Sequence, residues 1–361
     1  MLLEPRPDIA KEKLKDRFVS YYPEFEKGEF TIDQIPFDEP SSYPLYEFCA
    51  YDNKKSEKRV IVKFAPIFDE INEGLIEYNN LMQIYDKLEN SNQKIHVAKP
   101  LDFFKDINAL VTEKVDGKRL SNILLKDNSR FKSSSQKDIL VKLIESCGRW
   151  LSVLHKFTPS SQEVDLNDIY FPQLKQKLSV LQNIGFSDKV TSSVVSVIGD
   201  IINDPKFPKL ISVNQHGDYG PQNVVANNDH IYVFDLQREH LEVIYNDITY
   251  FLVTLETMNL KFRYLTYDYI KAREFKNAFL NGYFGKNISG LDIKERLLLA
   301  IYYLRNMIYR CEKQQNNMLA KYPKQVVKYY YSMKAIRSYT KRIFELLEEI
   351  QGLWEEYKSS Y

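Results

Sequence analysis

Two neighbouring stretches of the chain decide the fold: QHGDYGPQNVV at residues 215–225 and IYVFDLQ at residues 231–237. The first holds Asp218 and, five residues later, Asn223, and the second places Asp235 at the end of an apolar run. An acid, an amide at this spacing and a second acid after a strand are typical of phosphoryl-transfer sites. The glycines and the proline of the first stretch would give it the turns that aim these side chains inward.

The chemistry of phosphoryl transfer explains the three residue types. The Asp218 carboxylate would orient or accept the proton of an attacking hydroxyl. The Asn223 amide oxygen and the Asp235 carboxylate are hard oxygen ligands of the kind that magnesium takes when it bridges nucleotide phosphates. The plainer alternatives are an acidic loop that only forms turns and a degenerate protein that binds nucleotide without catalysis. The order and spacing of the three side chains favour catalysis.

The composition is that of an ordinary folded protein and disfavours several classes. The 361 residues suffice for two domains or for one core that splits into lobes. Apolar residues make up 44% and charged residues 27%, which disfavours disorder and fibrous repeats. The 50 Lys and Arg nearly cancel the 49 Asp and Glu. The chain therefore lacks the basic field that binding to nucleic acid usually requires.

Three features favour a cytoplasmic protein. Cys49, Cys147 and Cys311 lie far apart, without the paired spacing of zinc or redox sites, as expected of reduced thiols. The first residues lack the apolar stretch of a signal peptide. The densest apolar run, residues 297–304, is too short to cross a bilayer. We therefore expect a cytoplasmic location.

The first part of the chain has the pattern of a sheet with one helix. Alternating or β-branched runs between polar turns predict strands, and apolar side chains at helical spacing predict a helix. The predicted strands are 30–35, 45–50, 59–65, 97–104 and 109–115, and the predicted helix is 73–88.

Helical patterns dominate the rest of the chain. Residues 133–157 carry apolar side chains on one face, 171–202 have the pattern of a helical insertion, and 211–234 predict short strands flanking a loop. From residue 246 onward the pattern is helical again, with a break expected at 282–290, where Gly, Asn and Ser accumulate. The sequence thus predicts a small β-rich lobe followed by a large helical lobe.

The loop around Asp218 resembles that of the aminoglycoside phosphotransferase and choline kinase superfamily. That loop runs His-Gly-Asp, four residues, Asn, and a metal aspartate follows on a short hairpin. His216, Gly217, Asp218, Asn223 and Asp235 match this pattern position by position. The resemblance implies that Asp218 is the catalytic base, that Asn223 and Asp235 bind magnesium, and that His216 stabilises the loop.

The resemblance extends over about residues 30–255. LSVLH at 151–155 is similar to a family helix that ends in Leu-His, and NDITYFL at 246–252 is similar to the start of a later helix. His155, like His216, is expected to be structural rather than an acid–base group. Asp247 is expected to hold the loop or to cap a helix.

The same resemblance places the nucleotide on the N-terminal lobe. Lys63 would contact its phosphates, with Glu77 as the ion-pair partner and Glu73 as the competing candidate. The segment VTEKVDG looks like the hinge between the lobes, so main-chain groups of Glu113 and Val115 would hydrogen-bond adenine. A lysine at a strand end alone usually reaches into solvent, so the role of Lys63 depends on the downstream motif.

Two departures from the family pattern bear on the nucleotide. EPSSYP at residues 39–44 replaces the expected glycine-rich loop, so Ser41 and Ser42 hydroxyls and main-chain N–H groups would have to cover the phosphates. The choice between ATP and GTP stays open for this reason. Gln237 stands where family members often carry another acid, so a second magnesium would bind weakly or differently.

One basic segment has two interpretations. Residues 321–342 hold seven Lys or Arg, no Asp or Glu, and several tyrosines. They could bind anionic lipid headgroups or a glycan substrate. A solvated face of a packed helix, balanced by later acids, is the favoured alternative.

The sequence as a whole predicts an α+β fold of the protein-kinase-like, two-lobed type. A nucleotide-binding lobe with an antiparallel sheet and one helix is expected at 1–115. A helical lobe with the catalytic loop, the metal site and the acceptor pocket is expected at 116–361. The insertion at 171–202 and the C-terminal helices would wall the acceptor pocket.

The predicted activity is transfer of the γ-phosphoryl group of ATP, with Mg2+ as cofactor, to a hydroxyl of a small molecule. The acceptor would be a sugar, an aminoglycoside or a related metabolite, with a sugar preferred because aromatic residues make up 14% of the chain. A protein kinase is disfavoured because Asp-Leu-Gln replaces Asp-Phe-Gly. The open alternatives are a non-catalytic nucleotide-binding scaffold and a membrane-associated kinase of a lipid-linked glycan.

Overall fold

The computed structural model describes most of the chain. The described residues are 6–26, 29–35, 43–52, 57–66, 72–89, 94–127, 137–157, 159–182, 187–236, 241–260, 272–319 and 326–360. They fall into two compact units. The first comprises Met1–Lys118 and Val225–Glu239, and the second comprises Arg119–Val224 and His240–Tyr361.

An antiparallel sheet forms the centre of the first unit, in the order β1-β2-β3-β6-β5. Its strands are β1 (Phe30–Ile35), β2 (Leu45–Asp52), β3 (Glu57–Phe64), β5 (Pro100–Phe104) and β6 (Ala109–Glu113). The first three correspond to the predicted strands 30–35, 45–50 and 59–65 and form an antiparallel meander, in which Ile32 pairs with Ala50 and Phe48 pairs with Val60. These four side chains are buried because alternate residues of each strand face the core.

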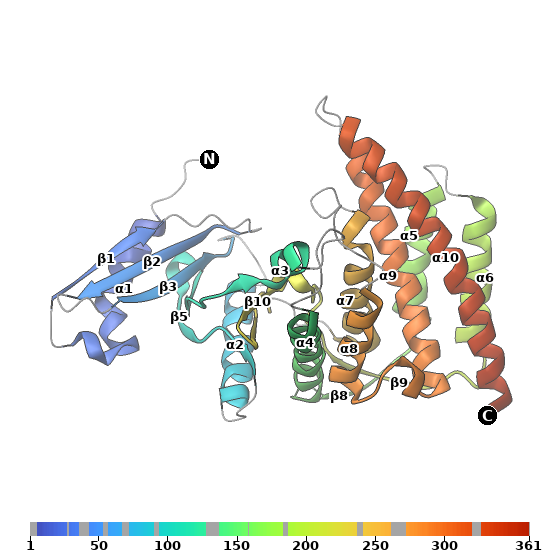
Figure 1. Ribbon diagram of the computed structural model, residues 1–361, viewed down its shortest axis with the longest axis horizontal. Helices are drawn as coiled ribbons and strands as arrows, with labels where there is room; N and C mark the ends of the chain where they lie inside the picture. Colours follow the sequence, from blue (N-terminus) through green and yellow to red (C-terminus); the bar gives the residue numbers. More distant parts are fainter. Residues whose placement is uncertain are drawn as a thin grey trace. The chain divides into compact units, whose positions relative to one another are not determined.

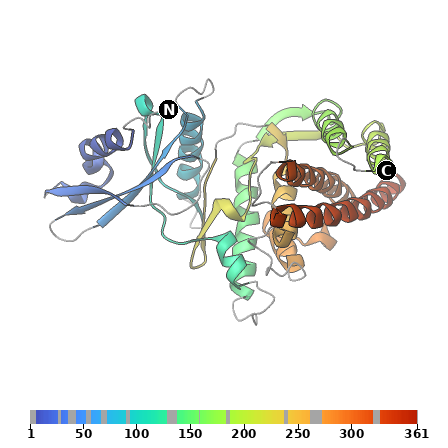
Figure 2. The ribbon, with the colours of Figure 1, turned by 90° about the horizontal axis from the view of Figure 1, so that it is seen from above.

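The helix α1 (Arg6–Tyr21) covers one face of this sheet (Figure 2). Ala10, Leu14 and Phe18 are fully buried in the same core as the strands. The sequence analysis did not predict this helix, so the first unit has one helix more than expected. The four-residue spacing of these three apolar side chains was the available signal.

The helix predicted at 73–88 is α2 (Glu73–Glu89), which packs against β4, β5 and β6. A second sheet has the order β4-β11-β10-β7. Its strands are β4 (Ile95–Val97), β7 (Lys118–Arg119), β10 (Val224–Asn227) and β11 (His230–Val233). β11 runs parallel to β4, with Ile231 opposite Ile95. This pairing explains why residues 225–239 belong to the first unit, whereas the sequence analysis assigned them to the helical lobe.

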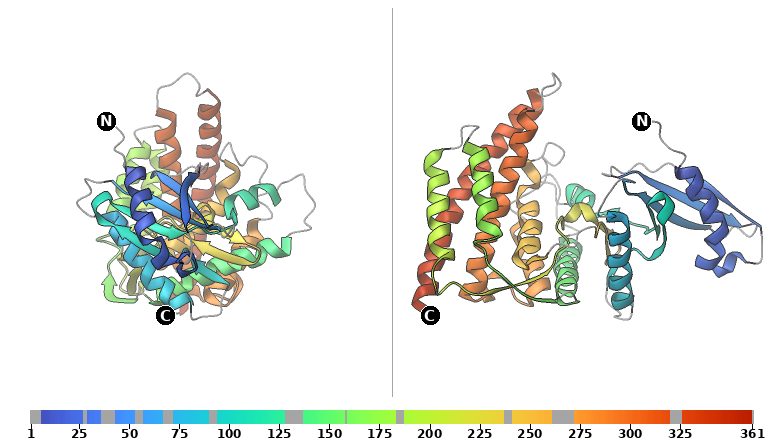
Figure 3. Two further views of the ribbon diagram at one scale, coloured as in Figure 1. Left: turned by 90° about the vertical axis from the view of Figure 1, so that its left-hand side faces the viewer. Right: turned by 180° about the vertical axis from the view of Figure 1, so that it is seen from behind.

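The second unit is helical, as predicted. Its helices are α3 (Leu120–Asp127), α4 (Lys137–Phe157), α5 (Tyr170–Gln182), α6 (Asp188–Ile202), α7 (Tyr245–Thr257), α8 (Ala272–Phe284), α9 (Ile293–Leu319) and α10 (Val326–Ser360). α9 packs against α10, α7 and α5, and α4 packs against α8. The long helices therefore lie side by side (Figures 1 and 3). The predicted α+β fold, with a β-rich N-terminal region and a helical C-terminal region, is confirmed.

Short elements complete both units. A sheet of order β12-β9-β8 in the second unit holds β8 (Pro159–Val164), β9 (Leu210–Asn214) and β12 (Leu241–Val243). The described single-turn 3-10 helices are η1 (Pro23–Phe25), η2 (Lys105–Ile107), η3 (Pro221–Asn223), η4 (Met258–Leu260) and η6 (Ile288–Gly290). The loop between β9 and η3 carries Asp218.

Two glycines let α4 and α8 approach closely. A Cβ at Gly148 would lie 2.0 Å from a backbone oxygen of α8, and one at Gly282 would lie 1.9 Å from a backbone oxygen of α4. The prediction that the helical pattern breaks from residue 282 onward is therefore wrong for the first residues of that range. α8 continues through Gly282 to Phe284, and Gly285, with φ +72°, follows its end.

The three cysteines are buried, free thiols in β2, α4 and α9. Burial raises the pKa of Cys49, of Cys147 and of Cys311, so these thiols resist deprotonation. Each then acts as a small apolar side chain of its core. Within the described ranges, no helix combines the length and the hydropathy that a transmembrane span needs.

Candidate active site

The loop after β9 is clamped by α7. Asp247 of α7 is fully buried, and its carboxylate accepts the backbone N–H of His216 at 2.7 Å and that of Gly217 at 2.9 Å. Its own backbone N–H donates to the side-chain oxygen of Gln215 at 3.2 Å. Gly217 has φ +79°, which a residue with a Cβ rarely adopts. The prediction that Asp247 holds the loop is confirmed.

The environment of Asp247 favours its anion. Burial alone would raise the pKa of this carboxyl, but its contacts with His155 and with the backbone of His216 hold the pKa below its usual value. His155 Nε2 lies 3.4 Å from Oδ2, and its other ring nitrogen lies 2.8 Å from the Tyr283 hydroxyl. A carboxylate without solvent access cannot reach a substrate, so Asp247 and His155 are structural.

Asp218 follows the clamped segment and, unlike Asp247, is partly exposed. The Tyr250 hydroxyl donates to its Oδ1. Asn223 Nδ2 donates to the Asp218 main-chain oxygen at 3.0 Å and lies 3.3 Å from Oδ2. Since the amide nitrogen of Asn223 makes these contacts, its amide oxygen is the atom that can face a cation. The structure thus brings together two of the predicted site residues.

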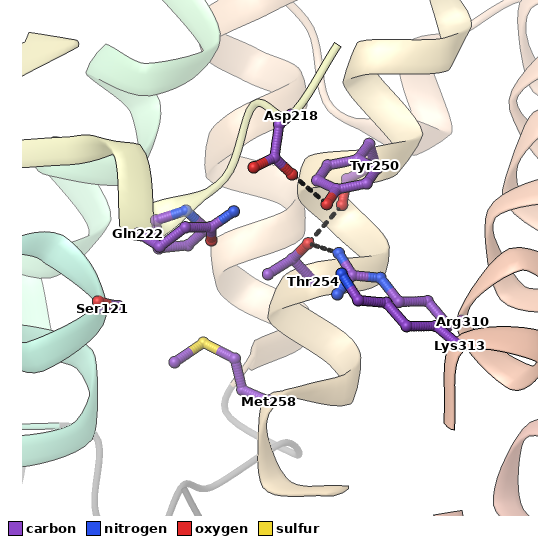
Figure 4. Close-up of a pocket in the computed structure, with 9 residues that line it drawn as sticks. Ser121, Asp218, Gln222, Tyr250, Thr254, Met258, Arg310 and Lys313 are labelled. Atoms are coloured by element: carbon purple, nitrogen blue, oxygen red, sulfur yellow. Dashed lines mark hydrogen bonds between the residues drawn. The ribbon is translucent and has the colours of Figure 1, made fainter. Parts of the chain in front are cut away.

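Asp218 lines a pocket of about 230 Å³ in the second unit, here called the Asp218 pocket (Figure 4). Its lining residues come from α3, η3, α7, η4 and α9 in addition to the loop: Ser121, Asp218, Pro221, Gln222, Tyr250, Thr254, Met258, Arg310 and Lys313. The sequence analysis expected the C-terminal helices and residues 171–202 to line the acceptor pocket, and of the C-terminal helices α9 lines this one. No residue of 171–202 is among its lining residues, so that prediction is wrong for this pocket. In this range, α5 packs against α9 instead, with Lys177 paired to Glu312 at 2.7 Å.

Arg310 connects α9 to α7 beside the loop. Its guanidinium carbon lies 4.7 Å from the centre of the Tyr250 ring, and its Nη2 donates to the Thr254 hydroxyl. Figure 4 shows the hydrogen bond between Arg310 and Thr254 near the one between Tyr250 and Asp218. Burial raises the pKa of Tyr250 well above its usual value, so the hydroxyl stays protonated and donates to Asp218.

In the first unit, Lys63 of β3 is held by two carboxylates, and the three residues are here called the Lys63 cluster. Lys63 Nζ lies 2.8 Å from Glu77 Oε2 and 2.6 Å from Asp235 Oδ1. The competing candidate Glu73 instead accepts the Tyr43 hydroxyl at 2.5 Å. Burial alone would lower the pKa of Lys63, but the two carboxylates raise it above its usual value. Lys63 is therefore a firmly charged, oriented cation.

The segment that carries Asp235 is fixed by α2. Asp235 follows β11 with φ +72°, a left-handed conformation that aspartate tolerates better than most residues. Asn80, three residues after Glu77 on α2, donates to the Leu236 main-chain oxygen at 3.0 Å. One helix thus positions both the Lys63 ion pair and the chain after Asp235.

The predicted adenine contacts lie at the end of β6. The Glu113 N–H donates to the Lys99 oxygen at 2.9 Å, and the Lys114 N–H donates to the Arg59 oxygen at 2.9 Å. The roles of Glu113 and Val115 stay predictions.

Some predicted residues lie outside the described part of the chain: Ser41, Ser42, Gln237 and residues 321–325. Within the described part of the basic segment, Tyr339 is 2% exposed, and Arg342 forms an ion pair with Glu256 at 3.3 Å. These two side chains pack against the helical core, as expected of a packed helix, and the solvated face expected for the basic segment stays a prediction.

Comparison with known proteins finds similarity in structure alone. No protein-family model matches the sequence, and no curated protein matches it significantly. Three similar solved structures cover most of the chain. A glucosamine kinase in complex with glucosamine, ADP and inorganic phosphate has a TM-score of 0.58, with 12% identity over 89% of this chain and 83% of that chain.

The other two belong to the families suspected from the sequence. A choline kinase from Cryptosporidium parvum Iowa II has a TM-score of 0.54, with 14% identity over 96% of this chain and 97% of that chain. The GDP complex of wild-type aminoglycoside 2'-phosphotransferase-IIIa has a TM-score of 0.51, with 10% identity over 92% and 99%. The resemblance predicted from the loop is thus confirmed at the level of the fold.

Several pocket residues escaped the sequence analysis. Tyr250 and Thr254 lie three and seven residues after Asp247 on α7, on one helix face, which is a signal that could have been used. Arg310 and Lys313 belong to α9, far along the chain, and carry no motif. Their place beside Asp218 follows from helix packing, which no local pattern encodes.

Proposed function

We propose that this protein is a small-molecule kinase, which transfers the terminal phosphoryl group of ATP to a hydroxyl group of its acceptor. The observation that carries the proposal is the partly exposed carboxylate of Asp218, oriented by Tyr250 and Asn223 in a pocket of about 230 Å³. The similar folds of a glucosamine kinase and a choline kinase add support. Since one fold can host many activities, the proposal rests mainly on the pocket.

In the proposed reaction, the acceptor hydroxyl donates a hydrogen bond to Asp218 and loses its proton to this carboxylate. The hydroxyl oxygen attacks the γ-phosphorus, the bond from phosphorus to the bridging oxygen breaks, and ADP leaves with that electron pair. The Tyr250 hydroxyl holds the carboxylate in one orientation. Orientation and charge neutralisation supply most of the rate enhancement in such reactions.

The nucleotide would be bound mainly by the first unit. Lys63, which Glu77 orients at 2.8 Å, is proposed to contact the phosphates. Main-chain groups of Glu113 and Val115 are proposed to bind adenine. Ser41 and Ser42 keep their proposed role as donors to the phosphates.

We propose that Asn223 and Asp235 bind a magnesium ion. Asn223 presents an amide oxygen, because its amide nitrogen is hydrogen-bonded to Asp218, and Asp235 presents a carboxylate. No group of three or more His, Cys, Asp or Glu that could hold a metal occurs among the described residues. Phosphate oxygens and water would then complete the ligands, as is usual for magnesium. When bound, the ion would neutralise charge on the transferring phosphate.

The test is phosphoryl transfer from γ-labelled ATP to a panel of sugars, aminoglycosides and amino alcohols. We expect product with wild type and magnesium, and none after chelation or in Asp218→Ala. Asp200→Asn, which changes an exposed carboxylate of α6, should retain activity. GTP is tested in parallel, because the solved aminoglycoside 2'-phosphotransferase-IIIa holds GDP.

Two other outcomes would redirect the proposal. Nucleotide binding without product from any acceptor would favour the non-catalytic scaffold. Transfer that requires anionic vesicles carrying a glycolipid would favour the membrane-associated kinase.

A further inference from the structure

The Asp218 pocket carries an excess of positive charge. Among its nine lining residues, Arg310 and Lys313 are cationic, and Asp218 is the one acid. In the described part of the chain, neither cation forms an ion pair with a carboxylate, in contrast to Lys63 of the first unit. An unpaired charge in a partly desolvated site favours a ligand of opposite sign.

Arg310 is the stronger signal of the two. Its side chain is buried, with the residue 7% exposed, and its Nε–H has no hydrogen-bond partner among the described residues. Its recorded partners are neutral, namely the Thr254 hydroxyl and the Tyr250 ring. A buried guanidinium with an unused donor is costly to fold unless an acceptor fills the site. The arginine geometry suits a carboxylate or a phosphate.

Lys313 adds a second positive charge three residues later on the same helix. Residues at this spacing are neighbours on a helix surface, where two like charges repel each other. Lys313 is exposed, so its side chain can bend toward a ligand in the pocket. A bound anion would relieve the repulsion between the two cations.

The same lining disfavours a cationic acceptor. Recognition of an ammonium group needs carboxylates or an open aromatic face. Oδ1 of Asp218 accepts the Tyr250 hydroxyl, the proposed reaction assigns the rest of this carboxylate to the acceptor hydroxyl, and the Arg310 guanidinium already lies over the Tyr250 ring. Ser121, Gln222 and Thr254 instead supply neutral groups that can hydrogen-bond hydroxyls.

We propose that the acceptor is an anionic, hydroxylated metabolite, whose carboxylate or phosphate group binds Arg310 and Lys313 while one hydroxyl meets Asp218. The inference rests on the proposed function and names its substrate class. The pocket volume of about 230 Å³ lies below the usual range for drug-sized ligands, so the acceptor is of monosaccharide size.

The experiment compares pyranoses that share one ring and differ in charge: glucose, glucosamine, glucuronate and glucose 6-phosphate. With wild type, we expect kcat/KM for an anionic acceptor to exceed that for glucose and glucosamine by at least about tenfold. The glucuronate and glucose 6-phosphate arms distinguish a carboxylate from a phosphate ligand. Lys313→Glu should lower the ratio of anionic to neutral acceptor by about tenfold.

The matched control is Lys189→Glu, the same charge change at an exposed lysine in the first turn of α6, where an acid is favourable. It should leave the ratio unchanged. Preference for glucosamine, or an effect of Lys313→Glu on the KM for ATP alone, would overturn the inference.

A binding measurement keeps the inference separate from the proposed function. Calorimetry measures glucuronate, glucose 6-phosphate and inorganic phosphate against wild type and Lys313→Glu. Anion binding that Lys313→Glu weakens would support the inference even if no acceptor is phosphorylated. Absent or equal binding in both proteins would reject it, whatever the activity.

Discussion

The Lys63 cluster of the first unit and the Asp218 pocket of the second carry opposite residual charges. In the cluster, one lysine lies between the carboxylates of Glu77 and Asp235. In the pocket, two cations accompany one carboxylate. A site with net negative charge favours the binding of a metal ion, and a site with net positive charge favours the binding of an anion. The difference agrees with the proposals that the first site binds a metal–nucleotide complex and that the second binds an acidic acceptor.

The largest expected effect comes from the one carboxylate of the Asp218 pocket. Asp218→Asn keeps the shape of the side chain and removes the proton acceptor, so kcat should fall about 1000-fold, or roughly 4 kcal/mol in activation free energy. Steady-state phosphorylation of the identified acceptor measures it, with Asp200→Asn as the matched control. A loss below tenfold would contradict the role of Asp218 as base.

The next effect tests the charge balance of the Lys63 cluster. Lys63→Met leaves two adjacent carboxylates without their cation, so the free energy of unfolding should fall by roughly 3 kcal/mol. Urea unfolding measures it. Lys58→Met on the same strand is the control. The Lys58 side chain is 40% exposed and pairs with Glu24 at 3.7 Å, and such a surface ion pair adds little to the free energy of unfolding. Equal stabilities of the two variants would show that Lys63 is not held as described.

The third prediction concerns Asp247, the buried carboxylate that holds the loop before Asp218 and belongs to neither of the two sites compared. The pKa of Asp247 in the folded protein is lowered from 3.8. Its ionisation therefore stabilises the fold fully above about pH 4, and this stabilisation is lost as pH falls further through the folded pKa. Asp247→Asn should lower stability by about 1–3 kcal/mol near pH 7 and flatten its dependence on pH below about pH 4. Unfolding curves across pH test this, and an unchanged acid slope would oppose it.

The smallest effect concerns the hydroxyl that orients Asp218. Tyr250→Phe keeps the aromatic ring beside Arg310 and removes the hydroxyl that donates to Asp218. Because one hydrogen bond is lost, kcat should fall about threefold to tenfold. The preference for anionic over neutral acceptors should persist, since Arg310 and Lys313 remain. A collapse of that preference would mean that Tyr250 itself shapes the acceptor site.

Features that depend on residues close together in the sequence were predictable. The strands β1, β2 and β3 and the helix α2 follow from hydrophobic periodicity. The ion pair between Lys63 of β3 and Glu77 of α2 was implied by the family resemblance instead. The spacing of Asp218 and Asn223 fixed their proximity, because both belong to one short loop. The helix α1 was missed although Leu14 and Phe18 repeat at helical spacing, since charged residues surround them.

Features that depend on packing between distant segments were not predictable. Arg310 reaches the pocket because α9 packs on α7, and nothing near residue 310 in sequence indicates this. The helical insertion was expected at the acceptor pocket, but α5 packs on α9 through Lys177 instead. Hydrophobic periodicity indicates that a helix has a buried face, but it does not indicate which other helix or strand packs against that face.

The burial of the three thiols gives each unit an internal reporter of its own opening. Cys49 lies in the first unit, and Cys147 and Cys311 lie in the second. Because burial raises the pKa of each thiol, an alkylating reagent can react appreciably only when the surrounding structure opens. The rate of labelling at each cysteine therefore measures the local opening equilibrium of its own unit. Adding nucleotide or acceptor and following which thiol becomes slower to label would show which unit each ligand stabilises.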